Sequence, residues 1–443
     1  MRRHGRFGGG RRARLPLLVG SLVLSTGVCS AGAVIGPVSP AHATPVTSFT
    51  WTGKAAKAAH SANDNWSDGA NWKGGVAPSA PGPVDLAFTA LTCSKKAPAC
   101  ATSNNDISGL TVQTLTLTGK VGKAKASPPA IDLTGDALTV TGGIDETTKL
   151  PKKGTHSFPN MFVDLAVQLS GDQTWNMNGW EVGFPAPVTG AVNLTIDFQN
   201  QGGIGFEAAG NSMTSVTGSG VGLLFVAPGA SLNTAGNPVT MKNGSVLYGL
   251  GAVGPLATSS AGVDVGNVVS PYGTLQVDGA IAFDSGSSLS LYDLTAGSGT
   301  PVAGTDYPQV LATGAVNLSS AGLNVFSDCG LPLGTAYTLL SASGGLSGTV
   351  TEGGAMASPG TTITSGMILQ APEDLALDPS CNTATPSYLQ FTYAADALVA
   401  TVVAPPPTAG PASHHRSVIH HVPATPVIAV DGAAGHAAFT TLR

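Results

Sequence analysis

A short phrase, in which apolar residues alternate with polar ones and a glycine closes the run, recurs from about residue 107 to 403. Clear examples span 115–119, 131–135, 138–142, 167–171 and 275–279. A period of two places the apolar side chains on one face, as in a half-buried strand. Glycine then supplies the turn, because a positive φ costs it little. The sequence therefore predicts many short strands joined by tight turns.

The spacing of these phrases, mostly near 20 residues, favours stacked coils in which each strand pairs with its counterpart in the next coil. A pair of β-sandwich domains is the main alternative, because sandwiches also carry short strands with frequent turns. No clear linker divides 107–403, which favours a single β-solenoid.

Composition narrows the class of protein. The chain has 443 residues with 59 Gly and 31 Pro, and only 10% of its residues are charged. An all-helical protein normally carries far more Glu, Lys and Arg. Beyond the first 43 residues, 14 basic residues stand against 25 acidic ones, and no arginine occurs between Thr44 and Gly410. This acidic balance provides no basic surface of the kind that binds nucleic acid.

The N-terminus has the pattern of a secretory signal peptide. Six arginines precede an apolar run from about Leu15 to Val28, and Ala41-His42-Ala43 forms a small-residue cleavage site. The Arg11-Arg12 pair leaves a twin-arginine export route open. No later apolar run is long enough for a transmembrane helix. We therefore expect an extracellular protein, either released or associated with the cell surface.

Four cysteines remain after the leader, namely Cys93, Cys100, Cys329 and Cys381. An even number in an exported chain predicts two disulfides. Of the three possible pairings, Cys93 with Cys100 and Cys329 with Cys381 closes the smaller loops.

Two stretches resemble a known class of protein. The first contains Trp51-Thr52-Gly53, Asn65-Trp66-Ser67-Asp68 and Asn71-Trp72, and it is similar to the opening of bacterial autotransporter passengers and related secreted β-helix proteins. The second, from Gly273 through Gly348 and again from Leu389 to Val403, is similar to the C-terminal part of those passengers. The resemblance implies a right-handed parallel β-helix of the adhesin or surface-protein type. The family's C-terminal membrane barrel has no counterpart after Val403.

Together these observations predict an all-β fold, a right-handed parallel β-helix with an N-terminal cap and a disordered C-terminal tail. We expect a signal peptide at 1–43, a Trp-rich cap segment at 44–106, a β-solenoid at 107–403 and a Pro/His-rich tail at 404–443.

Trp51, Trp66 and Trp72 are the candidate ligand-binding residues, because exposed tryptophans can stack on sugar rings. The alternative is that they plug the open end of the first coil. His414, His415, His420 and His421 are weak candidates for metal binding on a flexible segment. We expect no dedicated metal and no cofactor.

Paired acids could serve a glycosidase or a lyase, and Asp145-Glu146, Asp164, Asp172, Glu181, Glu373-Asp374 and Asp378 are candidates. A β-rich chain with this many acids offers such pairs by chance, and the missing arginines disfavour lyase chemistry on uronates. No Gly-x-Ser-x-Gly motif occurs.

We therefore predict a non-enzymatic, adhesin-like or structural surface protein whose partners are extracellular glycans or surface proteins. A carbohydrate-active β-helix enzyme and a glycan-binding module remain the alternatives.

Overall fold

The fold is taken from a computed structural model. It describes residues 46–57, 63–80, 82–91, 102–120, 122–123, 130–149, 156–157, 159–266, 272–295, 300–327, 330–354, 356, 359–371, 386–407, 427–431 and 436–440. Strands dominate this part of the chain, so the all-β prediction is confirmed. The described helical elements are one turn, α1 (Lys54–Lys57), and one 3-10 turn, η1 (Gly69–Asn71).

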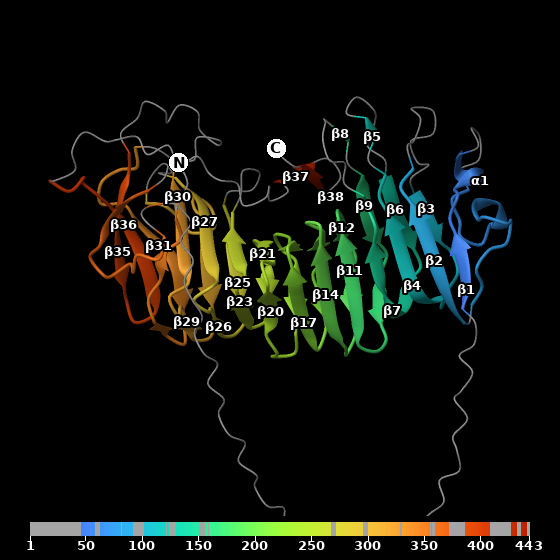
Figure 1. The fold of residues 1–443 in the computed structure, drawn as a ribbon, viewed down its shortest axis with the longest axis horizontal. Coiled ribbons are helices and arrows are strands. Elements are labelled where there is room, and N and C mark those ends of the chain that lie inside the picture. The colour runs from blue at the N-terminus through green and yellow to red at the C-terminus, as the bar shows by residue number, and fades with distance from the viewer. Residues whose placement is uncertain are drawn as a thin grey trace, which may run out of the picture. The chain divides into compact units, whose positions relative to one another are not determined.

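Most strands belong to three ladders in which every pair is parallel and each strand pairs with its counterpart from the neighbouring coil. The first ladder contains β1 (Thr47–Thr50), β2 (Pro83–Thr89), β4 (Thr111–Thr118), β7 (Leu138–Glu146), β10 (Val167–Leu169), β13 (Val188–Thr189), β16 (Asn211–Ser212), β19 (Ser231–Asn233), β22 (Ala252–Val253), β25 (Thr274–Val277), β28 (Gln309–Ala312) and β31 (Ala336–Ala342). Figure 1 labels β1, β2, β4, β7, β25 and β31 of this ladder, which follow one another in chain order from blue to orange.

The second ladder branches from β7. It contains β11 (Gln173–Asn178), β14 (Asn193–Gln199), β17 (Ser215–Gly220), β20 (Val239–Lys242), β23 (Leu256–Ser259), β26 (Ile281–Ala282), β29 (Val316–Asn317) and β32 (Leu346–Ser347). The first half of β7 pairs with β10 and its end pairs with β11. Gly142 and Gly143 mark the division, and a Cβ on either would lie 2.6 Å from a backbone oxygen of an adjacent strand.

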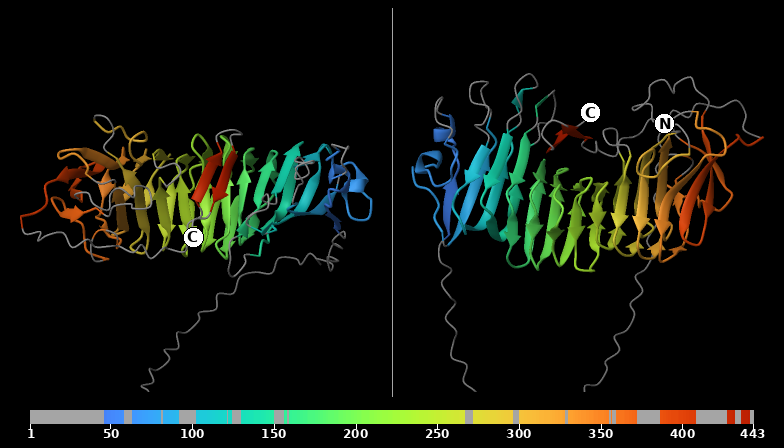
Figure 2. Two further views of the ribbon diagram at one scale, coloured as in Figure 1. Left: turned by 90° about the horizontal axis from the view of Figure 1, so that it is seen from above. Right: turned by 180° about the vertical axis from the view of Figure 1, so that it is seen from behind.

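The third ladder contains β3 (Thr102–Asn105), β6 (Ala130–Gly135), β9 (Asn160–Asp164), β12 (Glu181–Phe184), β15 (Gly203–Phe206), β18 (Leu223–Val226), β21 (Val246–Gly249), β24 (Gly262–Val265), β27 (Ser288–Leu294), β30 (Gly322–Ser327) and β33 (Thr351–Glu352). Figure 2 shows the same stacked order from above and from behind.

Residues of the same chemical kind stack on one another from strand to strand through the core. In the second ladder one buried column is entirely apolar and consists of Leu194, Val216, Val239, Leu256, Ile281 and Val316. A matching column in the third ladder consists of Val182, Ile204, Leu224, Leu247, Val263, Leu289 and Leu323. The alternation seen in the sequence therefore aims one side of every strand at a common interior.

Antiparallel strands occur where the parallel order stops. β34 (Ile368–Gln370), β35 (Tyr388–Tyr393) and β36 (Ala397–Val403) form an antiparallel meander, and β36 pairs with β31. Two small antiparallel pairs are β5 (Gly122–Lys123) with β8 (His156–Ser157), and β37 (Val427–Asp431) with β38 (His436–Thr440).

The ladders begin at β1, because residues 47–50 already pair in register with β2. The predicted domain boundaries, the disordered tail among them, stay predictions. The predicted signal peptide at 1–43 lies outside the described residues.

Candidate binding face

The outward side of the third ladder carries a column of aromatic and polar side chains, most of them buried. Because side chains alternate, Phe225 lies on the side opposite the core residues Leu224 and Val226. In register with Phe225 follow Tyr248, Asp264, Ser290 and Asn324 on successive strands. An aromatic and polar column therefore runs across five coils.

Contacts along this column are direct. The rings of Phe225 and Tyr248 stack with centroids 5.4 Å apart and planes at 17°. Asp264 accepts a hydrogen bond from Ser290, and the Asn324 amide nitrogen donates to the Ser290 oxygen over 3.4 Å. The column joins one aromatic stack to one hydrogen-bonded polar chain.

Burial changes the titration of this column. Burial raises the pKa of Asp264 to about 6, although the hydrogen bond from Ser290 opposes the shift. Burial, and then the charge of Asp264, raises the pKa of Tyr248 above its ordinary value. Elsewhere in the fold, burial raises the pKa of Glu146 to about 7, and hydrogen bonds from Thr148 and Trp180 partly offset it.

These raised pKa values predict that the protein becomes less stable as the pH rises from about 5 to 8. A carboxyl with a raised folded pKa favours folding most below its unfolded pKa, and that contribution is lost as the pH rises through the folded pKa. For Asp264, with an ordinary value of 3.8, the shift corresponds to about 3 kcal/mol over the whole titration, and about half of this is lost above pH 5. The midpoint of thermal unfolding, measured at pH 5 and pH 8, is expected to fall, and Asp264→Asn should reduce the fall.

Asp172→Asn is the matched control. Hydrogen bonds from Asn193 lower the pKa of Asp172, so its titration lies below this pH window. The control should keep the fall that the wild type shows. A midpoint that rises from pH 5 to pH 8, or an Asp264→Asn variant indistinguishable from the control, contradicts the assignment.

A second aromatic pair lies further along the same ladder. Tyr292 of β27 and Phe326 of β30 stack with centroids 4.9 Å apart and planes at 2°. Both residues are half-exposed. The partly exposed rings offer an apolar surface to a ligand.

The three candidate tryptophans occupy a different environment, at the beginning of the ladders. Trp51, Trp66 and Trp72 are 4%, 0% and 2% exposed. Trp51 and Trp72 meet edge to face at 5.1 Å, and Phe88 packs against all three rings. No ring face is free for stacking on a sugar in this arrangement, and the geometry instead fits a plug at the end of the core.

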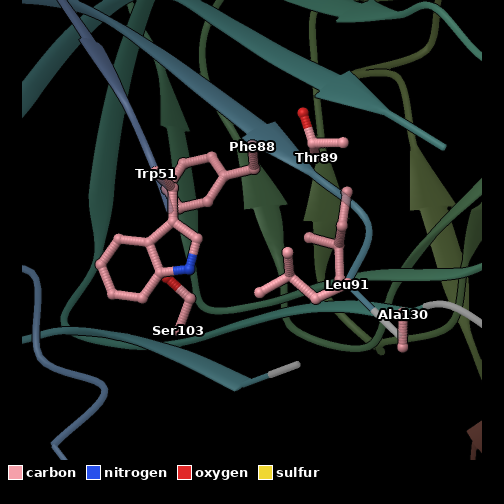
Figure 3. Close-up of a pocket in the computed structure, with 7 residues that line it drawn as sticks. Trp51, Phe88, Thr89, Leu91, Ser103 and Ala130 are labelled. Atoms are coloured by element: carbon pink, nitrogen blue, oxygen red, sulfur yellow. The ribbon is translucent and has the colours of Figure 1, made fainter. Parts of the chain in front are cut away.

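Hydrogen bonds hold this aromatic cluster in place. The Trp66 indole donates to the Ser103 hydroxyl over 2.6 Å, and the Trp72 indole donates to the Trp66 carbonyl over 2.7 Å. Figure 3 shows Trp51 beside Phe88 and Ser103 in the hollow next to the cluster. The hollow leaves no room for a water molecule, so it is a packing gap rather than a ligand site.

The described candidate acids have different surroundings. Glu146 is buried, where its carboxylate accepts hydrogen bonds from the backbone nitrogens of Thr148 and Trp180. Asp145 accepts a hydrogen bond from Asn176 over 2.6 Å, and Asp172 lies on the surface. Glu181 is 2% exposed. Among the described residues, no three His, Cys, Asp or Glu side chains lie close enough to hold a metal ion.

Several predicted positions lie outside the described residues. These are the cysteines Cys93, Cys100, Cys329 and Cys381, the histidines His414, His415, His420 and His421, and the acids Glu373, Asp374 and Asp378. In the part of the chain that is described, no helix has the length and apolar character that a membrane crossing needs.

Searches of protein-family models, of curated proteins and of solved structures found no match to this chain.

Proposed function

We propose that this protein is a secreted or cell-surface β-solenoid, a right-handed parallel β-helix, that acts as an adhesin-like or structural element by non-covalent binding. The three in-register ladders support the β-helix, and parallel crossover connections are right-handed in about 98% of known cases. The autotransporter-passenger resemblance agrees with this proposal.

The half-exposed stack of Tyr292 and Phe326 is the observation that carries the binding proposal. A ligand that covers the exposed part of this stack removes apolar surface from water without having to order the rings, because the stack is already formed. Asn324, two residues before Phe326, supplies amide groups on the same outward side of β30. An aromatic surface next to amide groups suits a sugar ring or an extended segment of a surface protein.

One outward column of the second ladder begins with a row of threonines. In the second ladder, Thr174, Thr195, Thr217 and Thr240 lie in register, and the last three are half-exposed. Hydroxyl groups in such a row can serve as hydrogen-bond donors and acceptors toward an extended partner. Substitutions in this row of threonines serve as the control in the binding experiment described next.

The test is binding of the chain from residue 44 to 443 on an array of glycans and extracellular-matrix proteins. The double variant Tyr292→Ala/Phe326→Ala is expected to lose at least about tenfold in affinity, as removal of a ring-stacking contact of about 1.5–3 kcal/mol implies. The control variant Thr195→Ala/Thr217→Ala should bind as the wild type does. Equal binding by all three proteins, or no binding by the folded wild type, contradicts the proposal.

The same samples test the enzyme alternative. Any polysaccharide that the array identifies is incubated with the protein, and reducing ends and unsaturated products are measured. The proposal expects no product. Product formation that a single acid-to-amide substitution abolishes would establish the carbohydrate-active alternative instead.

A further inference from the structure

The stack of Tyr292 and Phe326 lies beside a polar column on the same outward side of the third ladder. Ser290 precedes Tyr292 by two residues on β27, and Asn324 precedes Phe326 by two residues on β30. Asp264, Ser290 and Asn324 follow one another in register. Two residues of a strand span about 7 Å, so the aromatic pair and the polar column run side by side at about that separation. A ligand of the size of one sugar ring can therefore contact both.

Asn324 presents its carboxamide at the surface of the polar column. The side chain is half-exposed and lies beside exposed Gly353, where a Cβ would overlap the amide. The amide nitrogen donates one hydrogen bond, to the Ser290 oxygen over 3.4 Å. Because a primary amide has two N–H donors and a carbonyl acceptor, Asn324 can still donate to and accept from the hydroxyl groups of a ligand.

The part of the chain that holds this surface contains acids and no bases. Residues 243–413 include eleven Asp and Glu but no Lys, Arg or His. Asp264 lies in the polar column itself, and its pKa of about 6 leaves it mostly ionised at neutral pH. Proteins usually bind carboxylate, phosphate and similar anions through Arg or Lys side chains. An anionic ligand finds no such partner here and is repelled by the carboxylate.

Strand pairing disfavours an extended peptide as the ligand. A peptide that joins a sheet needs a strand edge whose backbone groups are free. β27 is paired on both sides, with β24 and with β30, and the beginning of β30 also pairs with β33. The backbone of β27 therefore offers no open edge, and recognition falls to the outward side chains.

We propose that the surface formed by Tyr292, Phe326 and Asn324 binds an uncharged glycan. One sugar ring covers the exposed part of the aromatic stack, and its hydroxyl groups exchange hydrogen bonds with the Asn324 amide. Glycans that carry uronic acids, sialic acids or sulfate groups are bound more weakly. This inference rests on the proposed function, and it names the ligand class of the same site.

Paired oligosaccharides test the charge selectivity. Oligomers of glucose, galactose, mannose and N-acetylglucosamine are immobilised, each beside a derivative in which the C6 hydroxymethyl groups are oxidised to carboxylates. The chain from residue 44 to 443 is expected to bind at least one neutral oligomer at least about fivefold more tightly than its oxidised derivative at low ionic strength. Added salt should reduce the difference, because it screens the repulsion.

Two substitutions test the assigned residues. Asn324→Ala is expected to weaken binding of the neutral oligomer about fivefold, as the loss of one or two hydrogen bonds implies, whereas Thr217→Ala should leave it unchanged. Ser288 is half-exposed on β27, two residues before Ser290. Ser288→Lys adds a cation beside the polar column and is expected to strengthen binding of the oxidised derivative at least about threefold. The uncharged control Ser288→Gln should not.

The outcomes separate this inference from the proposed function. Equal binding of neutral and oxidised oligomers overturns the inference and leaves the proposed function standing, as does binding to matrix proteins alone. An Asn324→Ala variant that binds as the wild type does, while Tyr292→Ala/Phe326→Ala loses affinity, has the same consequence. No binding by the folded wild type to any of these ligands overturns both.

Discussion

Replacing Trp66 by alanine is expected to destabilise the N-terminal coils by about 3–5 kcal/mol, the range for removal of a fully buried tryptophan. Trp66 is 0% exposed, and it contacts Trp72 and Phe88. Its indole also donates the hydrogen bond to buried Ser103, whose hydroxyl loses this partner in the variant. Because the cluster lies at the first strands of the ladders, the loss should appear as early unfolding of this end.

Denaturant unfolding followed by tryptophan fluorescence, with hydrogen exchange to locate the change, measures this effect. Val76→Ala is the control, since Val76 is 64% exposed and its truncation should change stability by less than about 0.5 kcal/mol. If Trp66→Ala unfolds like Val76→Ala, the cluster does not close the core, and the sugar-stacking interpretation of these tryptophans returns.

Leu224→Asp is expected to have the largest effect of any single substitution considered for this protein, a loss of more than about 4 kcal/mol. Leu224 is 0% exposed and lies between Ile204 and Leu247 in an apolar column. A carboxylate there has no partner, and each coil is stabilised by its neighbours, so the defect should divide the stack into two separately unfolding parts.

The matched control for this substitution is Val221→Asp. Val221 lies three residues away and is 51% exposed, so a charge there remains in water. Calorimetry measures the unfolding midpoint of the wild type and of each variant, and the difference between the variants shows whether position 224 lies in the core. A Leu224→Asp protein that unfolds as late as Val221→Asp would show that this side of β18 does not face the core.

The stacking of strands could be predicted because its cause is local. Each short segment such as Leu138 to Gly142 contains its own alternation of apolar and polar residues and its own turn, and neighbouring coils repeat this pattern. The division of β7 into two ladders could not be predicted, because it depends on strands far apart in sequence approaching Gly142 and Gly143.

The candidate face was harder to predict than the fold. Tyr292 and Phe326 are 34 residues apart in sequence, and only the register of β27 with β30 brings them together. One signal was present in the sequence: the run Leu223-Leu224-Phe225-Val226 is apolar without alternation, which indicates a strand covered on both faces. The tryptophans were conspicuous by type, but residue type does not reveal whether a ring is buried.

The register of neighbouring coils is the central claim, because both the core and the binding face follow from it. Thr195 lies in register with Thr217, and Thr217 lies in register with Thr240. Register partners in adjacent strands are about 4.8 Å apart, whereas strands two apart are separated by about 10 Å. Histidines at Thr195 and Thr217 can share one nickel ion, but histidines at Thr195 and Thr240 are too far apart to do so.

The most direct measurement is the shift of the thermal unfolding midpoint when Ni²⁺ is added to these two double-histidine variants. Ni²⁺ is expected to stabilise Thr195→His/Thr217→His by about 1–3 kcal/mol, and to leave Thr195→His/Thr240→His and both single variants unchanged. Stabilisation of both double variants alike, or of neither, would contradict the stacked register and the account built on it.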